Sequence, residues 1–198
     1  MGGMNRRDAA KLLVTAPVVG AFRWAPGSVR EAAALAREAL AATPPYRPKF
    51  FTAHEWRTVR LLVDIILPAD EHSGSATQAG VPEFIDFMCS DDPGLRIPVR
   101  GGLAWLDTQA HDSFGAPFAD GAEPDRSAIL DRIAWPKRAR PSDAQGAAFF
   151  TSFRDLTASG FYSSRMGVHD LRYLGNTFVR EWTGCPPEAL AKLGVTYP

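Results

Sequence analysis

The residues best suited to chemistry are a run of three polar side chains, Asp70, Glu71 and His72, and a pair, His169 and Asp170. The run offers oxygen and nitrogen atoms that bind metal ions, but adjacent loop residues seldom converge on one ion without ligands from elsewhere. The pair has the composition of a general acid and base, which is common on protein surfaces. We interpret both as solvated surface groups and predict no catalytic, cofactor-binding or metal-binding residue.

The sequence lacks the common catalytic and cofactor-binding motifs whose residue spacing is required by their chemistry. It has no glycine-rich phosphate loop, no G-x-S-x-G, no H-E-x-x-H and no C-x-x-C. Gly101 and Gly102 lack the preceding strand and third glycine of a dinucleotide-binding turn, so we interpret them as a local adaptation of the backbone. These absences argue against a self-sufficient enzyme of a common type.

The two cysteines exclude a disulfide-dense scaffold and a four-cysteine metal site, and they allow one disulfide or none. Cys89 ends an apolar segment and is predicted to be a buried small hydrophobe. Cys185 lies in "TGCPP" and is predicted to be exposed and able to pair, either with Cys89 or with another subunit.

Composition indicates an ordinary globular domain. The chain has 198 residues, of which 45% are hydrophobic, and its 22 Lys and Arg are balanced by 22 Asp and Glu. This length suits one well-buried domain. Nucleic acid is not expected as a partner, because nucleic-acid binding usually requires a basic excess that neutralises phosphates.

Hydrophobic spacing predicts an all-α domain of five to seven helices, since no sustained period-2 alternation occurs. An alanine-rich helix is expected over residues 28–42, and a central core helix over 52–67, where Thr52 and Glu55 have capping-box spacing. Pro82 suits the start of another helix, and a further helix is expected over 97–110.

Three more positions carry helix-boundary signals. Asp125 is expected to cap the helix that contains Ile129 and Ile133, and Ser142 with Gln145 is expected to cap the next. Gly160 is predicted to end that last helix. A long irregular segment is then expected from about residue 161 to 185.

The irregular segment is rich in aromatic residues that no helical stripe requires for the core. Tyr162, Tyr173 and Trp182 must either fold back over the helices or meet a partner, because exposed aromatic clusters are unfavourable. Both readings stay open here. If they meet a partner, these three residues and Cys185 form the candidate interface, and Trp182 is the first candidate for its aromatic anchor.

The amino terminus has the form of an export signal. Arg6 and Arg7 precede a short apolar stretch over residues 12–22, which is too short to span a bilayer. Paired arginines at this place indicate the twin-arginine route, which exports folded proteins. Residues 1–27 are therefore predicted to be a leader or membrane anchor, with an amphipathic helix as the alternative, and residues 28–198 a single helical domain. A small-x-small sequence typical of leader cleavage occurs at residues 39–41.

Taken together, three blocks behind this leader resemble the gluconate 2-dehydrogenase subunit 3 family. The blocks are "FFTAHEWRTVRLLVDIILPADEHSGSATQAGVPEFIDFM", the Phe149-Phe150 pair before a helix, and "GFYSSRMGVHDLRYLGN" leading to "GCPP". The arginine-rich "PKRARP" segment departs from the family pattern.

The resemblance implies a small helical subunit without its own flavin, which binds a large FAD-dependent dehydrogenase subunit of the glucose-methanol-choline type and carries it folded to the periplasm. The complex would oxidise a sugar, sugar acid or glycoside and pass electrons to a c-type cytochrome or another acceptor. The chain itself has no C-x-x-C-H haem attachment motif. Two other interpretations remain: an independent periplasmic metal-binding or acid-base enzyme, and a membrane-tethered structural module.

Overall fold

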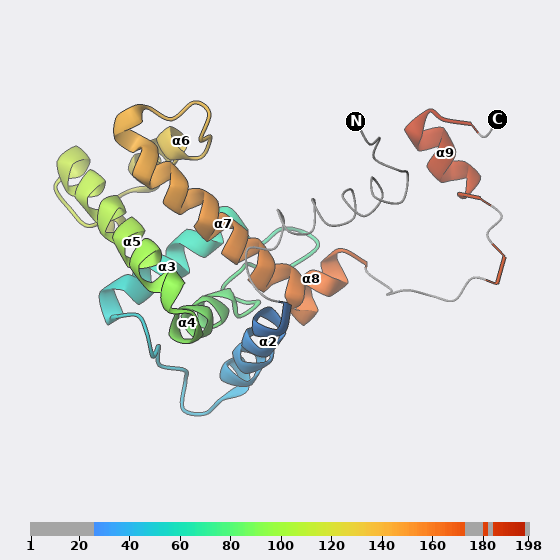
Figure 1. Cartoon of the computed structure of the whole chain (residues 1–198), viewed down its shortest axis with the longest axis horizontal. Coiled ribbons are helices and arrows are strands. Elements are labelled where there is room, and N and C mark those ends of the chain that lie inside the picture. The colour runs from blue at the N-terminus through green and yellow to red at the C-terminus, as the bar shows by residue number, and fades with distance from the viewer. Residues whose placement is uncertain (1–25, 173–179, 182–183, 197–198) are drawn as a thin grey trace, which may run out of the picture.

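The computed structural model describes residues 26–172, 180–181 and 184–196 (Figure 1). Within these ranges the secondary structure is helical, with eight α-helices, two short 3-10 helices and no strand. In chain order the elements are α2 (Pro26–Ala41), α3 (Ala53–Ile66), α4 (Val81–Asp91), α5 (Pro93–Phe114), η1 (Phe118–Asp120), α6 (Glu123–Ile133), η2 (Pro141–Asp143), α7 (Ala144–Ser163), α8 (Arg165–Asp170) and α9 (Pro187–Leu193). The predicted all-α class is confirmed.

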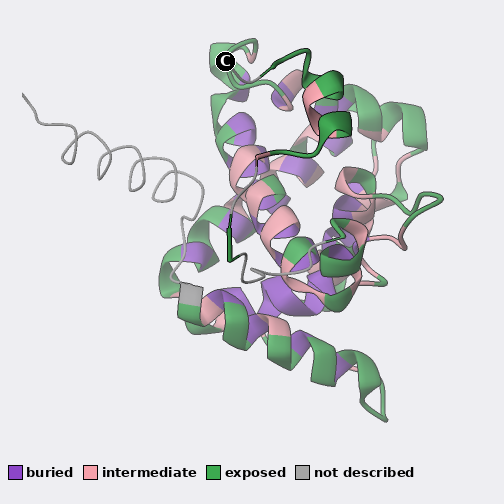
Figure 2. Ribbon diagram, turned by 90° about the vertical axis from the view of Figure 1, so that its right-hand side faces the viewer, coloured by how far each residue is buried: buried purple, intermediate pink, exposed green. Residues whose placement is uncertain are grey.

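Helix α4 is the centre of the domain. All nine of its residues from Val81 to Cys89 are buried, and it contacts α2, α3, α5 and α7. A helix that is buried around its whole circumference must be covered on every side, which four neighbouring helices achieve. Figure 2 shows the same arrangement from the side, with buried residues on the inward turns of the helices and exposed residues on their outward turns. The prediction that residues 52–67 form the central helix is wrong, because α3 buries only one face.

The predicted start of α3 is confirmed. The Thr52 hydroxyl accepts the N–H of Glu55 at 3.2 Å, and the Glu55 carboxylate accepts the N–H of Thr52 at 2.8 Å. These bonds satisfy two backbone donors that the first turn of a helix leaves without partners.

Helix α5 is longer than predicted because a cap lies upstream of the expected start. The Asp92 carboxylate accepts the N–H of Gly94 at 2.8 Å, and Pro93 opens the helix. Gly102 lies against the ring of Phe149 in α7, where a Cβ atom would overlap the ring. Gly102 therefore serves close helix packing, whereas a Cβ at Gly101 would meet nothing within 4 Å.

Three boundary predictions are wrong. Ala122 is the residue before α6, so Asp125 lies inside the first turn. Asp143, rather than Ser142, precedes α7 and makes no capping bond, because its carboxylate is held by Arg132. Gly160 does not end α7, which continues to Ser163 and brings part of the expected irregular segment into the helix. A Cβ at Gly160 would lie 2.8 Å from the ring of Phe84, so this glycine allows α7 to approach α4.

Helix α2 is an integral part of the domain. Its buried residues, Val29, Ala32, Ala36 and Ala39, recur at helical spacing and face α4 and α7. The small-x-small sequence at residues 39–41 forms the last turn of this packed helix. Residues 26–41 are packed as part of the folded domain, and cleavage there would remove α2 from the core.

A single buried carboxylate holds the segment before α3 against α4. Asp86 is fully buried and accepts four hydrogen bonds: from the Tyr46 hydroxyl at 2.6 Å and from the backbone N–H groups of Lys49, Phe50 and Phe51 at 2.8, 3.0 and 3.1 Å. Burial, followed by the bond to Asp86, raises the pKa of Tyr46, so its hydroxyl remains a donor.

Asp86→Asn is expected to lower the free energy of unfolding by about 2 kcal/mol or more, because an asparagine replaces one acceptor oxygen with an amide group that cannot accept these donors. Urea denaturation of the purified chain measures the loss. Asp91→Asn, at an exposed position of the same helix, is the control and should change stability little. Equal stability of the two variants would contradict this role for Asp86.

Candidate functional site

The polar run that opened the sequence analysis forms a turn. Asp70 Oδ1 accepts the N–H groups of His72 and Ser73, each at 2.8 Å, and these bonds, led by that of Ser73, lower the pKa of Asp70. Glu71 and His72 form only an exposed contact of 3.4 Å. Within the described ranges, no group of three His, Cys, Asp or Glu residues is placed to hold a metal ion. The two backbone hydrogen bonds to Asp70 shape the loop.

The shortest histidine–carboxylate contact in the described ranges is one that the sequence did not indicate. His54 Nε2 lies 2.6 Å from Asp107 Oδ2, and Asp107 Oδ1 accepts the N–H of Phe118 at 3.0 Å. These contacts join α3, α5 and η1, so the pair is a structural bridge. The residues are 53 positions apart, and no local pattern could have paired them. His169, in contrast, lies in the last turn of the short helix α8, where its carbonyl accepts the N–H of Arg172.

The loop of residues 67–80 is ordered by its own hydrogen bonds. The N–H of Ala76 donates to the carbonyl of Leu67 at 3.0 Å, and the N–H of Thr77 donates to the Asp64 carboxylate of α3 at 2.7 Å. Ala76 is fully buried. A loop tied at its centre and base in this way presents a fixed surface.

A sharp corner between α7 and α8 places α8 beside this loop. The Ser164 hydroxyl donates to the carbonyl of Phe161 at 2.6 Å and accepts the N–H of Gly167 at 3.0 Å, which caps α8. Gly167 is buried against that carbonyl, and a Cβ atom there would overlap it. Met166 reaches the loop, since a Cβ at Gly74 would lie 3.0 Å from its Cε.

A groove of about 370 Å³ lies where α2, the loop and α8 meet. Its lining comes from the end of α2, from the loop and from the corner: Ala33, Arg37, Leu40, Ala41, Gln78, Ala79, Ser164, Arg165 and Met166. Three exposed apolar side chains belong to the same helices: Leu40 on α2, Val168 on α8 and Leu171, 58% exposed, just after α8. We call the groove and these three residues the α2–α8 surface.

Of the predicted interface residues, Tyr162 lies next to this surface. It is in the last turn of α7, 40% exposed, and its ring packs edge-on against Phe161 at 5.2 Å. Tyr173 and Trp182 lie outside the described residues, as do Arg6 and Arg7 of the expected leader.

The two cysteines have different environments, as predicted. Cys89 is fully buried, and burial raises the pKa of its thiol to about 12, so the thiol stays protonated and inert. Cys185 is exposed.

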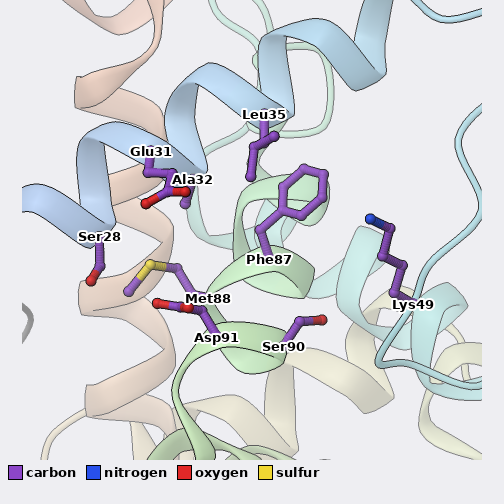
Figure 3. Close-up of a pocket in the computed structure, with 9 residues that line it drawn as sticks. All are labelled: Ser28, Glu31, Ala32, Leu35, Lys49, Phe87, Met88, Ser90 and Asp91. Atoms are coloured by element: carbon purple, nitrogen blue, oxygen red, sulfur yellow. The ribbon is translucent and has the colours of Figure 1, made fainter.

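A second hollow, of about 220 Å³, follows the seam between α2 and α4 (Figure 3). It is lined by Ser28, Glu31, Ala32, Leu35, Lys49, Phe87, Met88, Ser90 and Asp91. Glu31 and Asp91 lie at one end of the hollow, near Ser28 and Met88, and Lys49 lies at the other end, where its Nζ is 5.6 Å from the centre of the Phe87 ring. The mixed lining fits a packing seam better than a site for one class of ligand.

Gly167→Ala is expected to displace α8 from α7 and to cost about 1–3 kcal/mol, because the added methyl group has no space beside the Phe161 carbonyl. Hydrogen exchange of the α8 amides should become faster. Gly101→Ala is the matched control, since nothing lies within 4 Å of a Cβ there, and it should stabilise α5 by about 0.5–1 kcal/mol. Unchanged exchange in α8 would show that the corner is not tightly packed.

Comparison with known proteins agrees with the blocks noted in the sequence. The family model of gluconate 2-dehydrogenase subunit 3 matches residues 53–181, a range that includes the loop and α8 but not α2. Searches of curated proteins and of solved structures found no match. None of the helices in the described ranges is long and apolar enough to cross a membrane. Because the match covers more than half of the sequence, the chain belongs to the gluconate 2-dehydrogenase subunit 3 family, whose members are subunits of a dehydrogenase complex.

Proposed function

We propose that this chain is the non-catalytic small subunit of a periplasmic FAD-dependent dehydrogenase complex, and that it binds and stabilises the large flavoprotein subunit through the α2–α8 surface. FAD belongs to the large subunit in this proposal, and electrons leave the complex through a c-type cytochrome or another acceptor. The substrate class is a sugar, sugar acid or glycoside. The leader, with Arg6 and Arg7, directs the folded pair through the twin-arginine route.

The observation that carries the proposal is that the α2–α8 surface exposes apolar side chains, and that hydrogen bonds within the chain already hold the elements that present them. Leu40 is exposed and lines the groove, and Val168 and Leu171 are exposed in and just after α8, the helix whose first residues, Arg165 and Met166, line the same groove. Hydrogen bonds fix the walls of the groove. Apolar side chains grouped beside a groove are typical of protein contact sites. Little ordering entropy is lost when a partner binds a surface that is already held in place.

The alternative of an independent enzyme has less support. Of its candidate groups Asp70, His72 and His169, Asp70 shapes a turn. The other histidine–carboxylate pair, His54 with Asp107, joins three elements. Purification of the chain alone, followed by a flavin spectrum and a turnover assay with sugars, separates the two proposals. A colourless and inactive chain fits the subunit, whereas turnover or a stoichiometric flavin would refute it.

Leu171→Asp is expected to weaken binding to the large subunit by more than tenfold, because a charge would be buried in an apolar contact. Co-purification of a tagged chain from its native host measures the association. Ile97→Asp is the matched control: Ile97 is 83% exposed on α5, away from the groove, and its change should leave association intact. Trp182→Ala remains a prediction of the same kind, and both variants should melt as the wild type does.

If Leu171→Asp and Ile97→Asp co-purify with the partner equally well, the α2–α8 surface is not the interface. If Leu171→Asp instead lowers the melting temperature of the free chain, α8 has a role in the fold that its exposure does not indicate.

Replacement of Arg6 and Arg7 by lysine is expected to keep the chain and its flavoprotein partner in the cytoplasm, because the twin-arginine route distinguishes arginine from lysine at equal charge. Fractionation of cells with immunoblotting of both subunits gives the result. The matched control is Arg30→Lys, an exposed position in α2 behind the leader. Unchanged periplasmic activity would contradict the export role.

A further inference from the structure

The turn between α6 and η2 presents an exposed tryptophan among basic residues. Residues 134–140, which we call the basic loop, contain Trp135, 64% exposed, followed by exposed Pro136, Lys137, Arg138 and Arg140. The carbonyl of Trp135 accepts the N–H of Arg138 at 2.8 Å and that of Ala139 at 3.1 Å. These bonds fix the turn that displays the tryptophan ring.

A half-buried ion pair holds the base of the basic loop. Arg132 Nη2 donates to Asp143 Oδ1 at 2.5 Å and to Gln109 Oε1 at 2.7 Å, while Arg132 Nε lies 3.3 Å from Asp143 Oδ2. The Asp143 side chain is almost completely buried, and its bond to Arg132 lowers its pKa. The two ends of the loop therefore have a fixed separation, and its tip is presented on a stable base.

The cations of the basic loop form no ion pair within the described part of the chain, although the charge of Arg140 contributes, after Arg132, to lowering the pKa of Asp143. Four arginines outside the loop form ion pairs with carboxylates: Arg57, Arg100, Arg132 and Arg154. In the described ranges, no carboxylate lies within 4.0 Å of the charged groups of Lys137, Arg138 or Arg140. A chain with no formal net charge thus concentrates three unpaired cations around one exposed tryptophan.

The basic loop and the α2–α8 surface lie at opposite ends of α7. Helix α7 has 20 residues, which corresponds to a length of about 30 Å, and Figure 1 shows α6 at one of its ends and α8 at the other. A partner bound at the α8 end leaves the basic loop available for a second contact.

We propose that the basic loop binds the surface of an anionic phospholipid membrane, with the Trp135 ring at the level of the headgroups and Lys137, Arg138 and Arg140 beside their phosphates. Tryptophan and basic residues are the side chains enriched at membrane–water interfaces. Five exposed loop residues are few for a stable protein interface, which typically takes about 20–30 residues a side. The inference rests on the proposed function for its setting, which places the complex in the periplasm beside a membrane surface.

Sedimentation of the full chain with vesicles tests the proposal without the large subunit. Vesicles of phosphatidylcholine and phosphatidylglycerol in equal amounts should bind the wild type, and binding should weaken as salt rises. Lys137→Gln with Arg138→Gln should lower the partition onto these vesicles by about tenfold or more, and Trp135→Ala by severalfold. Pure phosphatidylcholine vesicles should not distinguish the loop variants from the wild type.

The matched control is Arg30→Gln with Arg47→Gln, which removes the same charge from two exposed positions outside the loop. It should bind anionic vesicles as the wild type does, and every variant retains the leader, so any contribution of the leader is common to all. Equal loss in both double variants, or no loss in either, would overturn the proposal. Loss of co-purification with the large subunit, with vesicle binding intact, would also overturn it and would identify the loop as a protein contact.

Discussion

The structure depends on the four hydrogen bonds that Asp86 accepts inside α4. A buried carboxylate is costly unless its oxygens are satisfied, and here all the donors come from one segment, residues 46–51. That segment connects α2 to α3, so the carboxylate determines where both helices meet α4. The polar contact sets the path of the chain, while apolar burial around α4 supplies most of the stability.

Helix α7 connects the two surfaces to which we assign partners. It can lie close to its neighbours because glycines face bulky rings: a Cβ at Gly146 would lie 2.6 Å from the ring of Trp105, and one at Gly160 would lie 2.8 Å from that of Phe84. Glycine lowers intrinsic helix stability, and the packing of large rings into the space it leaves offsets that loss. The helix is consequently a rigid spacer between the basic loop and α8.

The two surfaces share a design in which polar contacts below the surface hold exposed side chains in place. In the basic loop, the ion pair of Arg132 and Asp143 fixes the base, and in the α2–α8 surface, Ser164 and Asp64 hold α8 and the loop. The Asp70 carboxylate likewise shapes a turn, and His54 with Asp107 joins three elements. Such a use of polar residues fits a subunit that acts by contact, as proposed above.

The sequence by itself determined the all-α class, the start of α3 and the burial of Cys89, because these depend on local spacing and on caps formed within one turn. It also indicated the family through blocks that lie in residues 53–181. The sequence could not locate the centre of the domain, since burial of α4 on every side requires four helices to assemble around it. Nor could the sequence show that α7 continues past Gly160, or that the Asp143 carboxylate pairs with Arg132 and does not cap α7. Both outcomes depend on side chains that other elements supply. Only the tertiary structure joined α2, the loop of residues 67–80 and α8 into one surface, since these segments are far apart in the chain and meet only when the core forms.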